Sequence, residues 1–145
     1  MNHNDRNRAT RERLIAVIER LGERAIAMDG GWTTSALLAH LAFWDRLAET
    51  RLAKFVRDGE TPVTAEPALT DLTNGAGMRQ WTDTPPAVAA AQARDAAEDM
   101  DRLVEALSAE KLSALMTLDR PLLYDRSGHR TQHLDQIEQA LRRTR

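Results

Sequence analysis

The chain contains four histidines, and three of them occupy positions that favour ligation of a metal ion. His129 and His133 are four residues apart, so on an α-helix both project from one face. His40 shares the apolar stripe of another predicted helix with Leu37 and Trp44. Three neutral imidazoles can bind a divalent ion and leave a coordination position open, as in catalytic rather than structural sites. The pattern therefore predicts a metal site formed by His40, His129 and His133.

A second interpretation of these histidines needs no metal. A histidine on an apolar face is commonly a hydrogen-bonded core residue, and an H-x-x-x-H pair also arises by chance. A third inward histidine on a different helix favours ligation, but the residues alone leave both interpretations open. The fourth histidine, His3, lies in a polar segment, residues 1–9, that we expect to be a disordered tail.

Hydrophobic periodicity predicts the elements that must position these rings. A first helix is expected over residues 10–28 and stops at the Asp29-Gly30-Gly31 sequence. Thr33 or Thr34 then caps a second helix, which carries His40 and continues to about Arg57.

The second half of the chain begins with a segment rich in Pro, Gly, Thr and Asp, residues 59–84, which predicts a partly helical crossover. Thr84 is the expected cap of a third helix that continues to Leu107, with Pro85 at its first position. A fourth helix starts between residues 121 and 127 and ends near Arg142. The predicted fold is all-α: one domain, residues 1–145, built as a four-helix bundle with a long crossover between helices two and three.

Composition excludes several classes of protein. The chain has no cysteine, which removes disulfides, thiolate metal sites and a cysteine nucleophile. A net charge of −2 does not favour nucleic-acid binding, and no apolar run approaches the ~18 residues that span a membrane. The N-terminus lacks the apolar region of a secretion signal, so we expect a cytoplasmic protein with no membrane or nucleic-acid partner.

Two motifs resemble those of a known family. Residues 32–44 are similar to its W-T-x-x-x-x-L-x-H-L-x-x-W segment, and residues 129–137 to its H-x-x-x-H-x-x-Q-I segment. Asn74 also falls where many relatives carry Asn. The chain resembles the DinB/YfiT-like superfamily of metal-binding four-helix bundles, which includes mycothiol-dependent maleylpyruvate isomerase and bacillithiol transferases. The resemblance extends from about Leu14 to Leu141.

The resemblance implies an up-down-down-up bundle, a homodimer, and a zinc or nickel ion held by His40, His129 and His133. Characterised relatives use the metal to join a low-molecular-weight thiol to an electrophile, and others isomerise. The mycothiol isomerase branch has a Glu among its ligands, so the all-histidine set here is closer to the broader DinB-like branch. The implied function is a metal-dependent thiol transferase, with a small thiol and an electrophile as its partners. The alternatives are a non-catalytic metal-binding or stress-response protein with a structural metal, and a relative that binds no metal.

Residues around the site are expected to orient the ligands and to line a pocket. Metal-bound imidazoles usually donate their other N–H to a carboxylate or carbonyl, and Asp125 lies one turn before His129. The other candidate carboxylates are Asp45, Glu49 and Asp135, and a solvated helix face is the alternative for all four, favoured for each one taken singly. Arg79 is expected to receive a carboxylate of the thiol. The remaining expected pocket residues are Trp32, Trp44, Asn74 and Trp81.

Overall fold

Helices form nearly all the regular structure of the computed structural model, which describes residues 1–64 and 66–144. Among these residues there is no β-strand, and Ala27 and Thr33 form an isolated antiparallel bridge. None of the helices in the described ranges is long and apolar enough to cross a membrane. The elements are α1 (His3–Leu21), η1 (Asp29–Gly31), α2 (Thr34–Asp58), α3 (Pro67–Thr82), α4 (Pro86–Glu105), α5 (Ala109–Met116), η2 (Pro121–Leu123) and α6 (Ser127–Arg143), where η marks a 3-10 helix.

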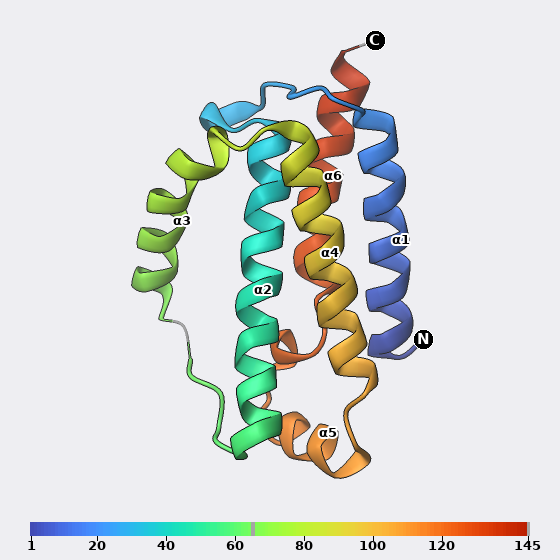
Figure 1. Ribbon diagram of the computed structural model, residues 1–145, viewed down its shortest axis with the longest axis vertical. Helices are drawn as coiled ribbons and strands as arrows, with labels where there is room; N and C mark the ends of the chain where they lie inside the picture. Colours follow the sequence, from blue (N-terminus) through green and yellow to red (C-terminus); the bar gives the residue numbers. More distant parts are fainter. Residues whose placement is uncertain (65, 145) are drawn as a thin grey trace.

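The long helices α1, α2, α4 and α6 pack lengthwise against one another (Figure 1). In Figure 1, α1 and α6 run toward the end that holds the C-terminus, whereas α2 and α4 run the opposite way. The chain therefore returns along the length of the molecule between α2 and α4, and α3 forms part of this return on the outer side of α2. The predicted all-α bundle is confirmed, and the segment expected to be a partly helical crossover contains α3.

The first helix is displaced from its predicted position toward the N-terminus. The prediction that residues 1–9 form a disordered tail is wrong, because Asn2 and Asp5 form a capping box that starts α1 at His3. Asn7 ties this end to the rest of the fold, donating to the Tyr124 carbonyl and accepting from the Arg126 amide. The helix ends at Leu21 rather than Met28 because Gly22 adopts a φ of +59°.

Local signals also fix the helices that carry the histidines. The Thr33 side chain accepts a hydrogen bond from the Ala36 amide at 3.0 Å and caps α2, which ends at Gly59 with a φ of +72°. The Asp125 carboxylate accepts the Ser127 amide at 3.0 Å at the start of α6. The third long helix starts at Pro86, two residues beyond the predicted cap.

The core consists of two apolar clusters along the bundle axis. One joins α1, α2, α4 and α6 and includes Leu14, Leu41 and Ile137, each no more than 2% exposed. The other lies between α2, α4, α5 and η2 and includes Leu52, Met100 and Leu115. Burial of each such side chain contributes about 1.5–3 kcal/mol, so the bundle has a hydrophobic core that does not depend on the histidines.

Candidate metal centre

Three histidines from two helices converge at one point. His40 comes from α2, and His129 and His133 come one turn apart from α6. One nitrogen from each ring lies within 4.8 Å of the others. The His133 ring centre is 4.8 Å from that of His40 and 4.8 Å from that of His129. The structure therefore brings together the three residues that the sequence singled out as ligands.

The spacing of the nitrogens fits a metal ion. The Nε2 atoms of His40 and His129 are 3.3 Å apart. Two nitrogens that each bind a tetrahedral zinc ion at about 2.0–2.1 Å are separated by about 3.3 Å. A movement of His133 toward the other two rings would bring all three nitrogens to this spacing. The donor set, and the spacing of two of its three nitrogens, thus fit a divalent ion.

The three imidazoles are held in the neutral form that metal binding requires. Burial lowers the pKa of His40 to about 4, with a smaller effect from His133. Burial, followed by the nearby positive charge of Arg126, lowers the pKa of His129 to about 2. Burial also lowers the pKa of His133, although a hydrogen bond to Gln136 opposes the shift. At neutral pH the rings therefore offer lone pairs without competition from protons.

The outer nitrogens of the rings differ in their contacts. His133 Nδ1 lies 2.8 Å from Gln136 Oε1, which turns Nε2 toward the other two rings. The Nδ1 atoms of His40 and His129 are buried, and neither has a hydrogen-bond partner among the described residues. Gln136, which the sequence motif contains, is therefore the polar group that orients a candidate ligand.

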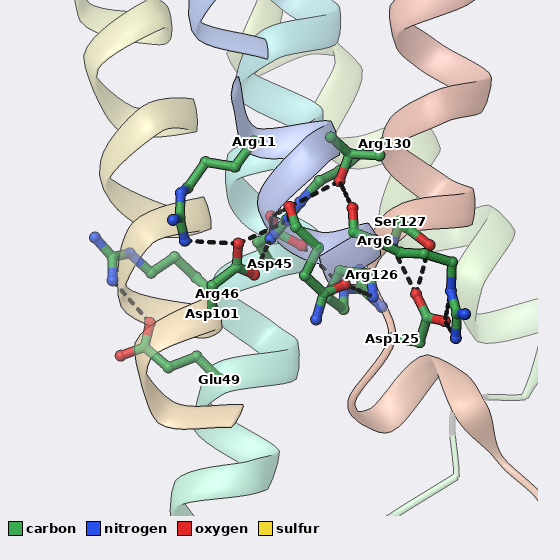
Figure 2. Close-up of polar contacts among 12 residues, drawn as sticks. Arg6, Arg11, Asp45, Arg46, Glu49, Asp101, Asp125, Arg126, Ser127 and Arg130 are labelled. Atoms are coloured by element: carbon green, nitrogen blue, oxygen red, sulfur yellow. Dashed lines mark hydrogen bonds and ion pairs between the residues drawn. The ribbon is translucent and has the colours of Figure 1, made fainter. Parts of the chain in front are cut away.

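The prediction that nearby carboxylates hydrogen-bond to the histidines is wrong, because these carboxylates pair with arginines (Figure 2). Asp45 accepts hydrogen bonds from Arg126 Nε at 2.9 Å and Arg130 Nε at 3.0 Å. Asp125 accepts from Arg6 and from Ser127. The two remaining candidates also pair with arginines: Glu49 with Arg46, and Asp135 with Arg13.

Aromatic side chains surround His40. The rings of Trp32 and Trp81 meet it edge to face, with centres 5.6 and 5.1 Å away. Trp44, one turn further along α2, donates its indole N–H to Asn74 Oδ1 at 2.8 Å. This bond fixes the Trp44 ring and links the crossover helix α3 to the histidine face of α2.

A cleft of about 940 Å³ opens beside the histidines, within the size range of small-molecule sites. Its wall includes three of the expected pocket residues, Trp32, Trp44 and Asn74. The fourth, Trp81, packs against His40 as a buried ring and is not part of the wall. Arg79 is not part of this wall: it is exposed on α3, five residues after Asn74 and therefore on another side of the helix.

The model of one protein family matches most of the sequence: that of the DinB superfamily, over residues 6–137. The chain belongs to the DinB superfamily. Searches of curated proteins and of solved structures found no match. Membership of the DinB superfamily and the three-histidine group together fit a metal-binding protein.

The cleft of this DinB-superfamily protein also contains residues that the sequence analysis missed. Gln132, Gln136 and Gln139 extend the His129 face along α6 in steps of three and four residues, a signal that was available in the sequence. Arg51 lies on α2, whereas Arg120 and Arg126 directly precede η2 and α6, so no spacing rule could have grouped the three.

Proposed function

We propose that this protein is a metal-dependent enzyme that transfers a low-molecular-weight thiol to an electrophile. The observation that carries the proposal is the convergence of three neutral imidazoles, within 4.8 Å of one another, on the wall of a cleft of about 940 Å³. Zinc or nickel suits a site made of imidazole nitrogens. The chain itself contains no cysteine, so the reacting sulfur comes from a co-substrate.

The chain would hold and surround the reactants. When bound, a divalent ion supplies an open position at which a thiol loses its proton near neutral pH. His40, His129 and His133 fix that position, and Gln136 fixes the orientation of His133. The transfer forms a carbon–sulfur bond and breaks the bond from carbon to the leaving group, which departs with the electron pair. The thiol proton passes to solvent.

The wall of the cleft would position the electrophile. Trp32 and Trp44 offer apolar faces beside His40, and the hydrogen bond to Asn74 keeps the Trp44 indole in place. Preorganised walls of this kind raise rates by holding two reactants close together in a fixed orientation.

A structural metal is the second candidate function. The ligands come from α2 and α6, so an ion between them would cross-link two long helices. In that case the metal would contribute most of the folding stability. The apolar cluster that joins α1, α2, α4 and α6 favours the enzyme, because it already holds α2 and α6 together.

Elemental analysis of protein purified without a histidine tag is the decisive experiment. We expect about one zinc or nickel ion per chain, lost in His133→Ala and retained in the matched control His3→Ala. The loaded protein should then accelerate the reaction of cysteine with 1-chloro-2,4-dinitrobenzene, in which chloride leaves, whereas His133→Ala should not. Absence of metal after incubation with excess zinc and nickel would contradict the proposal.

A further inference from the structure

Three arginines gather at one end of the cleft that holds the histidines. Arg51 follows His40 on α2 by eleven residues, about 16 Å along the helix. Arg126 precedes His129 at the start of α6, which runs antiparallel to α2. Both therefore lie on the same side of the histidine group, toward α5 and η2, and Arg120 joins them from the segment before η2.

We propose that Arg51, Arg120 and Arg126 form an anion-binding subsite, so that one substrate of the enzyme carries a carboxylate or a phosphate group. The role in catalysis rests on the proposed function, whereas the binding of an anion does not. A substrate that uses both parts of the cleft would place its reacting atom beside the histidines and its anionic group beside the arginines.

The positive charge at this end is neutralised only in part: Arg126 shares Asp45 with Arg130, and neither Arg51 nor Arg120 forms an ion pair with the described residues. Arg51 is half-buried and makes no ion pair or hydrogen bond with the described residues. Its burial and the proximity of Arg120 and Arg126 lower its pKa. The carboxylates on the cleft wall are Asp29 and Asp119, and neither forms an ion pair within the described ranges. A guanidinium that is partly desolvated beside two others gains most from an anionic partner.

The other two arginines are held in place by the fold. Arg120 donates to the carbonyls of Pro62 and Val63 at 2.8 and 3.0 Å. The Arg126 side chain is 8% exposed, and its Nε and Nη1 donate to Asp45 and Leu122. Its Nη2 makes no hydrogen bond with the described part of the chain. Two fixed guanidinium groups and a third with all its donors unused make a preorganised site for a planar or tetrahedral anion.

Titration of the metal-free protein with small anions tests the subsite independently of the metal. The probes are propionate, inorganic phosphate and, as the neutral match of propionate, propionamide. Binding is followed through the NMR signals of the arginine Nε–H groups, which report Arg51, Arg120 and Arg126 directly. We expect saturable binding of at least one anion, with shifts at these three signals, and no binding of propionamide. The tighter anion identifies the substrate group as a carboxylate or a phosphate.

Two matched variants make the test specific. Arg51→Met should weaken anion binding at least fivefold. Arg143→Met removes one positive charge from the opposite end of the cleft, at the C-terminus of α6, and should change anion binding less than twofold. Equal binding of propionate and propionamide, or equal losses in the two variants, would overturn the proposal. Metal content separates the two hypotheses. Arg51→Met should retain its metal, and wild-type protein that binds anions but takes up neither zinc nor nickel when incubated with an excess of each would refute only the enzymatic function.

Discussion

Nε2 of His40 lies 3.3 Å from Nε2 of His129, although the residues are 89 positions apart in the chain and belong to different helices. The packing of α2 against α6 creates this contact, and both helices are anchored by apolar clusters that do not include the histidines. The site is therefore built on a folded bundle, and metal binding and folding can be separated by experiment.

Removal of the metal by a chelator is expected to leave the helical content unchanged and to lower the melting temperature. An ion present at a thousand times its Kd stabilises a folded site by about 4 kcal/mol through mass action alone. Circular dichroism and thermal melts with and without zinc measure both effects. His133→Ala should show no response to zinc, and loss of helix on chelation of the wild type would indicate a structural metal instead.

The metal-free protein is expected to lose stability as the pH falls below about 6.5. The folded pKa values of about 4 for His40 and about 2 for His129 lie below the unfolded value of about 6.5, so acid protonates the unfolded chain first. Between its unfolded and its folded pKa, each such histidine lowers the free energy of unfolding by up to about 1.4 kcal/mol per pH unit. Urea unfolding at pH 7.5, 6.0 and 5.0 measures the slope. His129→Gln should reduce this slope, and an unchanged slope in that variant would contradict the low pKa of His129 in the folded protein.

The histidine site could be predicted because its members lie on helix faces that sequence periodicity reveals. His129 and His133 share a face at four-residue spacing, and His40 lies on an apolar stripe, so helical geometry alone turns all three inward. Their contacts across helices required only that α2 and α6 be neighbours.

The surroundings of the site could not be predicted in the same way. The partners of Asp45 are Arg126 and Arg130, 81 and 85 residues away, and the spacing of residues along one helix does not reveal what the opposite helix presents. The end of α1 could not be predicted from periodicity either. The apolar stripe continues past Gly22, whereas the backbone leaves the helix at that residue.

Asp45→Asn is expected to destabilise the protein by about 3–5 kcal/mol, because it leaves the buried Arg126 without a counter-charge and leaves Arg130 with Asp101 alone. Asp45 is 2% exposed between Arg126 and Arg130 (Figure 2). The matched control is Asp99→Asn, which breaks an exposed pair with Arg46 and should cost at most about 1 kcal/mol. Denaturant unfolding of both variants gives the comparison, and equal losses would show that the buried network does not stabilise the fold.

Gly77→Ala is expected to disturb the histidine site through Trp81. A Cβ at position 77 would overlap Cη2 and Cζ2 of the Trp81 indole, and this buried ring packs edge to face on His40 with centres 5.1 Å apart. Gly75→Ala on the same helix is the control, since its Cβ would meet nothing within 4 Å. Alanine stabilises a helix by about 1 kcal/mol over glycine, whereas overpacking costs about 1–3 kcal/mol. Gly77→Ala should thus be about 1–3 kcal/mol less stable than Gly75→Ala in urea unfolding and bind zinc more weakly. Equal stability and zinc affinity of the two variants would mean that Trp81 does not transmit the change to His40.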